Sequence, residues 1–210
     1  MRDRWGTVRL EAFSDGVFAI AATLLVLDIG VPASKFDDLW RGILDQWPSY
    51  LAYATSFITI GGLWLLHHGV FRRLAFADNV VTRLNLLLLM SVAFLPFPTR
   101  LVAEAIDMAD AERAAVIFYG ASLLTITLLT NAMWRYVARN RDLLEPGVSE
   151  RDVKAVLDVT TPNVGFYVFV IALAILAPRA AAFGYLVVAL LAVVRVHGDS
   201  APDKGRNRPA

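Results

Sequence analysis

Residues 9–30 read RLEAFSDGVFAIAATLLVLDIG, and this stretch decides the fold. It is almost entirely apolar from Gly16 to Ile29, although one acid, Asp15, precedes the apolar run and another, Asp28, lies near its end. At a rise of ~1.5 Å per residue, a helix of this length reaches roughly 30 Å, about the thickness of a hydrocarbon core. The stretch therefore predicts a transmembrane helix. An acid inside such a helix marks either a functional site or a structural pairing.

The same residues have some features of a cleavable secretory signal. The first nine residues are basic, the following run is apolar, and small residues stand at Val31–Ser34. Against cleavage, acids flank the apolar core and several more apolar segments follow. We therefore expect the segment to be retained.

Composition points to the membrane as well. The chain has 210 residues, of which 57% are hydrophobic, and its mean hydropathy is +0.55. Both values exceed those of an ordinary soluble domain. The chain contains no Cys, which excludes disulfides, thiolate metal sites and a cysteine nucleophile. Its basic residues are spread along the chain, and nothing indicates nucleic-acid binding.

Five further apolar stretches predict five more spans. They cover residues 47–70, 80–102, 114–137, 162–177 and 180–196. Pro96 and Pro98 predict a kink or an end inside the third span, because two such prolines interrupt an α-helix. We expect a surface loop or an interfacial half-helix at 32–46, a solvated loop with a helical turn or two at 138–161 and a disordered tail at 197–210. Residues 1–196 are thus expected to form one all-α membrane domain with six transmembrane helices.

The distribution of Lys and Arg predicts the orientation of these spans. An even number of spans places both termini on one side, and 15 of the 20 Lys and Arg residues fall on that side. The positive-inside rule therefore predicts a multi-pass protein of the cell membrane with both termini in the cytoplasm.

The first helix has an apolar stripe and a polar motif that point in different directions. At 100° per residue, Ile20, Leu24 and Leu27 fall on one stripe with Thr23 beside them. Asp15 lies about 150° from the middle of this stripe. The stripe could simply face lipid or a neighbouring helix, or it could face an axis shared with other subunits. Periodicity alone leaves both interpretations open.

The acid and the histidines also have more than one interpretation. Asp15 could be a proton relay or a buried anchor, and a lone carboxylate at this depth is more often paired. His67 and His68 diverge by 100° on a helix, which does not suit a shared metal ion. Haem ligation would need a second His on another span, and the only other histidine is His197 in the tail. We expect His67 and His68, with Trp64, to form hydrogen bonds near Ser14 and Asp15. The amides of Asn85 and Asn131 are candidates for interhelical hydrogen bonds.

Motifs for catalysis are absent from the sequence. It contains no G-x-S-x-G, no phosphate-binding G-x-x-x-x-G-K-[ST] and no H-E-x-x-H. We therefore expect neither an enzyme nor a metal site. The sequence also lacks TVGYG, which argues against a carbonyl-lined potassium filter.

The motif residues resemble the signature of the transmembrane protein 175 family, potassium channels of endolysosomes and prokaryotes. An Arg followed after three residues by Phe-Ser-Asp is matched by Arg9, Phe13, Ser14 and Asp15. The stretches WLLHHGVF at 64–71 and NLLLLMSVAFLPFPTRL at 85–101 are similar to that family's second and third helices. Residues after these match only in the length and number of helices. In prokaryotes a single six-helix unit of this kind assembles as a homotetramer.

The resemblance implies a potassium-channel fold without a re-entrant selectivity loop. Helix one of each subunit would line a central pore, with its constriction at Ile20, Leu24 and Leu27 and hydroxyls from Thr23 beside it. The resemblance also implies that Ser14 and Asp15 are packing anchors for Trp64 and the histidines. Four copies of Asp28 near the extracellular mouth would attract cations. The expected permeant ion is K+, with other monovalent cations possible and no other cofactor.

Two functions of other classes remain as alternatives. A proton-coupled secondary transporter would use Asp15 and His67/His68 as a relay, but we find none of the inverted repeats typical of such proteins. A membrane enzyme using the histidine pair would contain bound iron or zinc.

Overall fold

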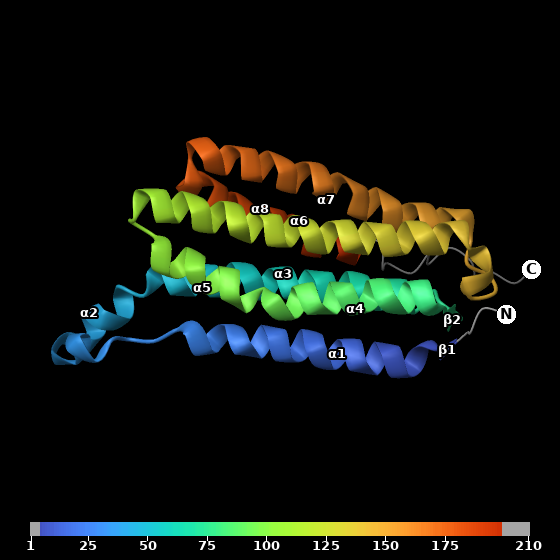
Figure 1. The fold of residues 1–210 in the computed structure, drawn as a ribbon, viewed down its shortest axis with the longest axis horizontal. Helices are drawn as coiled ribbons and strands as arrows, with labels where there is room; N and C mark the ends of the chain where they lie inside the picture. The colour runs from blue at the N-terminus through green and yellow to red at the C-terminus, as the bar shows by residue number, and fades with distance from the viewer. Residues whose placement is uncertain (1–4, 199–210) are drawn as a thin grey trace, which may run out of the picture.

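The structure is a computed structural model, and it describes residues 5–198 of the chain. Its main feature is a bundle of long helices (Figure 1). Five described helices are long and apolar enough to cross a membrane, at Thr7–Asp28, Trp47–Phe71, Asn79–Ala105, Asp110–Arg139 and Glu150–Leu176. A sixth helix, α8 (Pro178–Gly198), has an apolar stretch over Pro178–Leu191. The prediction of an all-α membrane protein is confirmed.

The first helix, α1 (Thr7–Leu24), lies at one edge of the bundle. It packs mainly on α3 (Trp47–Phe71) and α4 (Asn79–Phe94), and it has a smaller contact with α5 (Pro96–Ala105). It continues as a 3-10 turn, η1 (Leu25–Asp28), that tightens its last residues. At the other end, strand β1 (Trp5–Gly6) pairs antiparallel with β2 (Phe76–Ala77). This short ladder, which the sequence did not indicate, ties the start of α1 to the connection between α3 and α4.

The loop after α1 contains two short helical segments, η2 (Ala33–Asp38) and α2 (Leu39–Leu44). An ion pair joins the two parts of this loop, with Nζ of Lys35 lying 2.6 Å from Oδ2 of Asp45. This hydrogen bond lowers the pKa of the Asp45 carboxyl. Both side chains are partly exposed. The same loop also exposes the apolar side chains of Phe36, Trp40 and Leu44, so its surface mixes polar and apolar groups.

The prolines interrupt the third span as predicted. Helix α4 ends at Phe94, and α5 begins with Pro96. Proline is tolerated in the first turn of a helix, where no intrahelical partner is lost. The two prolines therefore divide one span into two consecutive helices.

The second half of the chain contains α6 (Ala109–Arg139), a 3-10 turn η3 (Arg141–Leu143), α7 (Glu150–Leu176) and α8. The loop predicted for 138–161 was too long, and Pro162 does not start a helix. Ser149 and Asp152 form a capping box that begins α7 at Glu150, with Pro162 inside the helix. Reciprocal capping satisfies the first free amides and thereby stabilises a helix start that charge alternation had obscured. The predicted tail lies outside the described residues, except that α8 still includes residues 197 and 198.

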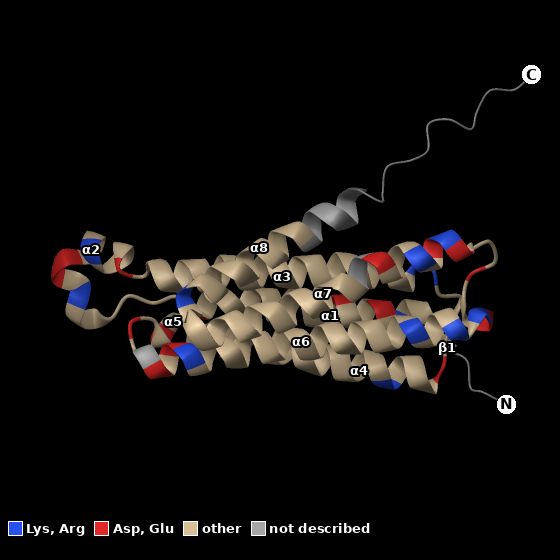
Figure 2. Ribbon diagram, turned by 90° about the horizontal axis from the view of Figure 1, so that it is seen from above, with Lys and Arg blue, Asp and Glu red and all other residues tan. Residues whose placement is uncertain are grey.

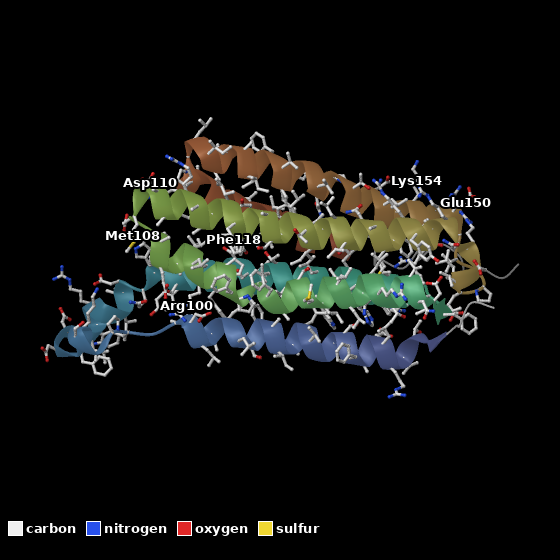
Figure 3. All side chains as sticks on the ribbon, viewed as in Figure 1. Arg100, Met108, Asp110, Phe118, Glu150 and Lys154 are labelled. Carbon is white, nitrogen blue, oxygen red and sulfur yellow. The ribbon has the colours of Figure 1, made fainter. Side chains whose placement is uncertain are left out.

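Charged residues gather at the two ends of the bundle, and its middle is almost free of them (Figure 2). Arg100, Met108 and Asp110 lie near one end, and Glu150 and Lys154 lie near the other (Figure 3). A membrane-spanning bundle requires this separation, because a charged side chain is costly in the hydrocarbon core and is hydrated at the membrane surface. Ser14, His67 and Asn85 are buried polar residues where α1, α3 and α4 meet.

Candidate functional site

The polar residues of α1 meet α3 and α4 in one hydrogen-bonded network. Its centre is Asn85 of α4, which is fully buried. The Nδ2 of Asn85 donates to Oγ of Ser14 at 3.0 Å, and its Oδ1 lies 2.8 Å from Nε2 of His67. Ser14 in turn donates to the carbonyl of Leu10, one turn earlier in α1. A single amide therefore connects three helices.

His67 is held by aromatic rings as well as by Asn85. Its ring stacks on Phe71 at a centroid distance of 4.2 Å and lies 5.3 Å from the ring of Phe18. Only 2% of the residue is exposed, and its Nδ1 has no hydrogen-bond partner among the described residues. A buried imidazole enclosed by two phenyl rings is positioned for packing, and water has little access to it.

Asp15 lies beside this network and faces α3. Its Oδ1 accepts a hydrogen bond of 2.8 Å from the indole Nε1 of Trp64. The indole also stacks on the ring of His68, whose Nδ1 lies 3.0 Å from Oε1 of Glu11. Thus α1 and α3 are linked by two polar contacts one turn apart, and the two histidines have different environments.

The four residues of the α1 motif point in three directions. Ser14 is buried against α4, and Asp15 is half-buried against α3. Arg9 and Phe13 are exposed on the outer side of the helix. Asn85 and Glu11 complete the contacts, and sequence reasoning had not assigned either as a partner. The prediction that Asn85 forms interhelical hydrogen bonds is confirmed, although its partners were not predicted.

The apolar stripe of α1 is turned away from the rest of the subunit. Ile20 is 61% exposed and Leu27 is 75% exposed, and Leu24 and Thr23 are exposed as well. The buried residues Ser14, Phe18, Ala21 and Leu25 lie on the opposite side of the helix. A helix at the edge of the bundle thus presents a continuous outer face with no partner among the described residues of its own subunit.

Asp28 ends the helical part of this segment and has a cationic neighbour. Its Oδ1 lies 3.9 Å from Nη1 of Arg100 in α5. Arg100 is shared, because its Nε also donates to Oε1 of Glu104 at 2.7 Å. The two carboxylates together outweigh the single guanidinium, so the end of α1 keeps a net negative charge.

The described residues contain no group of three or more His, Cys, Asp or Glu side chains that could hold a metal ion. The arrangement brings Trp64, His67 and His68 to the α1 motif and leaves the stripe outside it.

Comparison with known proteins shows that the chain is similar to ion channels. Residues 9–96 match the family described as endosomal/lysosomal potassium channel TMEM175. A potassium channel of Streptomyces collinus is 44% identical over 148 residues, which are 70% of this chain and 72% of the relative. The endosomal/lysosomal proton channel TMEM175 of Gallus gallus is 38% identical over 152 residues, 66% of this chain and 30% of the relative.

A solved structure is similar to most of the fold. The crystal structure of a lysosomal potassium-selective channel TMEM175 homolog from Chamaesiphon minutus has a TM-score of 0.82 and 38% sequence identity. The match covers 90% of this chain and 97% of that chain. The similarity therefore includes the second half of the bundle, where the sequence resemblance was weakest.

Proposed function

The chain belongs to the TMEM175 family of ion channels, and on that premise we propose that it forms a potassium-permeable cation channel. Four copies would surround one pore, with α1 of each copy lining it. The family consists of channels and not enzymes, so the histidine pair has no catalytic role. The permeant ions would be K+ and other monovalent cations, and no further cofactor is involved.

The outer face of α1 is the observation that supports this function best. Ile20, Thr23 and Leu27 lie opposite the face by which α1 packs on its own subunit. The polar network anchors that inner face, since Ser14 and Asp15 are bonded to α4 and α3. A rigidly held helix with an unpartnered outer face can line an axis between subunits.

The proposed pore closes by excluding water. A ring of Ile20, Leu24 and Leu27 side chains offers no oxygen to replace the hydration shell of a cation, so a narrow ring dewets and blocks conduction. The hydroxyl of Thr23 donates to the carbonyl of Ile20 at 2.9 Å. Its oxygen can still accept a hydrogen bond from pore water. Such a ring predicts modest discrimination among monovalent cations.

The remaining features of the proposed channel follow from charge and helix count. We propose that α8 is the sixth span, which places both termini in the cytoplasm as the Lys and Arg distribution predicts. The proposed pore contains no re-entrant selectivity loop. At the opposite, extracellular end, four copies of Asp28 would attract cations to the mouth.

Potassium flux into liposomes tests the proposed function against the proton-coupled alternative. We expect purified protein in liposomes to conduct K+ down a potassium gradient at equal pH on both sides. Asp15→Asn, if it assembles, should retain this flux, because a neutral amide can still accept the hydrogen bond from Trp64. Flux that requires a pH gradient and is abolished by Asp15→Asn would instead favour the transporter, and absence of any flux would contradict the channel.

A further inference from the structure

Two surfaces flank α1 in each subunit, one hollowed and one lined by exposed side chains. In Figure 2, α3 and α4 lie on either side of α1. On the α3 side is an open groove, here called the α1/α3 groove. It is lined mainly by Asp15, Ala19, Ala22, Phe57, Gly61 and Trp64.

On the α4 side is a row of protruding side chains, here called the α4 ridge. Its members follow a spacing of three and four residues, so they occupy one face of the helix and continue past the proline break. They are all exposed, and Met90 is the most exposed apolar member at 64%. The α4 ridge consists of Arg83, Leu87, Met90, Phe94 and Phe97.

Contacts within the subunit place the ridge and the groove at the same depth. Asn85 bonds Ser14, and α1 and α4 run in the same direction. Met90 follows Asn85 by five residues, and Ala19 follows Ser14 by five. Because each helix rises equally per residue, Met90 and Ala19 lie at the same depth. Helix α3 runs in the opposite direction, and its Trp64 donates a hydrogen bond to Asp15. Gly61 lies about one turn from Trp64, in the direction in which Ala19 lies one turn from Asp15, so Gly61 is at this depth too. Rotation about an axis normal to the membrane preserves depth, so these residues can meet between subunits.

Charge favours a second copy of the chain over lipid as the occupant of the groove. Arg83 lies two residues before Asn85 and is therefore level with the part of α1 between Glu11 and Asp15. It is exposed and forms no ion pair with any described residue of its own subunit. Lipid chains over the groove would face the half-buried Asp15 with hydrocarbon, which is costly for a charge, and they offer no counter-ion to Arg83. A neighbouring subunit brings the cation to the acidic side of the groove.

From this match we propose that the α4 ridge of one subunit packs into the α1/α3 groove of the next, with Arg83 completing the polar site around Asp15 and Glu11. The inference depends on the proposed homotetramer and specifies how its ring closes. The contact is head-to-tail, since two different surfaces meet, and a ring closes without leaving either surface free. The outer face of α1 between the two surfaces then faces the axis.

Cysteine cross-linking tests the contact in the intact protein, because the natural chain has no Cys. We expect the double variant Gly61→Cys/Met90→Cys in membranes to form disulfide-linked ladders up to the tetramer on oxidation. A Cβ at position 61 meets no atom within 4 Å, so the variant should fold. Ala19→Cys/Met90→Cys provides a second pair at the same depth. Gly61→Cys/Val80→Cys is the matched control, because Val80 is exposed on α4 about three turns below Met90.

Native mass spectrometry of the wild-type protein separates the two ways of failing. A tetrameric mass with ladders from both depth-matched pairs and none from the control supports the contact. A tetrameric mass without ladders from either matched pair, or with equal ladders from the control, overturns the contact and indicates lipid in the groove. A monomeric mass overturns the proposed homotetramer itself.

Discussion

Ile20→Asn is expected to increase potassium flux through the reconstituted channel by about tenfold or more, which corresponds to lowering a barrier by about 1.4 kcal/mol. Ile20 is exposed on the outer face of α1, and an amide there would hold water inside the proposed constriction. A wetted ring presents a smaller barrier to a hydrated cation than a dry one. The measurement is the initial rate of K+ flux in liposomes at equal protein content.

Ile175→Asn is the matched control for this variant. Ile175 is the same residue type, is 57% exposed and lies near the end of α7, away from α1. We expect its flux to equal that of the wild type. If Ile20→Asn also leaves flux unchanged, or if both variants raise it equally, Ile20 does not control conduction.

Gly120→Ala is expected to destabilise the bundle by at least about 1–3 kcal/mol, the usual cost of overfilling a packed interior. A Cβ on Gly120 would lie 1.9 Å from Oη of Tyr185 and 2.7 Å from Cγ1 of Ile171. Tyr185 cannot move aside easily, because it is 1% exposed, donates to the carbonyl of Val116 and packs edge-on against Tyr119. The glycine allows α6 to approach α7 and α8 closely, as small residues do in membrane bundles.

Thermal unfolding in detergent, followed by the loss of the folded peak in size-exclusion chromatography, measures this effect. Gly165→Ala in α7 is the control, since a Cβ there meets no atom within 4 Å. We expect the midpoint temperature of unfolding to fall clearly for Gly120→Ala and to stay unchanged or rise for Gly165→Ala. Equal midpoints for both variants would show that the α6–α7–α8 contact tolerates a methyl group.

The long apolar segments were predictable because hydropathy and length alone determine which helices can cross a membrane. The start of α7 was not, since the charges between 138 and 161 are typical of a solvated loop. Its deciding feature was local, the reciprocal cap formed by Ser149 and Asp152. The capping pattern was present in the sequence and would have corrected the boundary.

The polar network was predictable only in part. The angular separation between Asp15 and the Ile20–Leu27 stripe follows from helix geometry, and in the structure these residues occupy different sides of α1. The partner of Ser14 could not be found in this way. Asn85 reaches both Ser14 and His67 because α1, α3 and α4 meet at one depth. This meeting depends on tertiary packing and cannot be found from the spacing of residues along the chain.

The position of Thr23 allows the most direct test of whether the outer face of α1 lines a conducting pore. Thr23→Cys introduces the only thiol of the chain, so a positively charged methanethiosulfonate reagent can react at that position alone. The measurement is K+ flux in liposomes before and after the reagent is added to both sides, with wild-type protein as the unreactive control. We predict that modification stops flux through Thr23→Cys, because a fixed cation in the pore repels K+. Unchanged flux in protein that mass spectrometry finds fully modified would contradict a pore lined by α1.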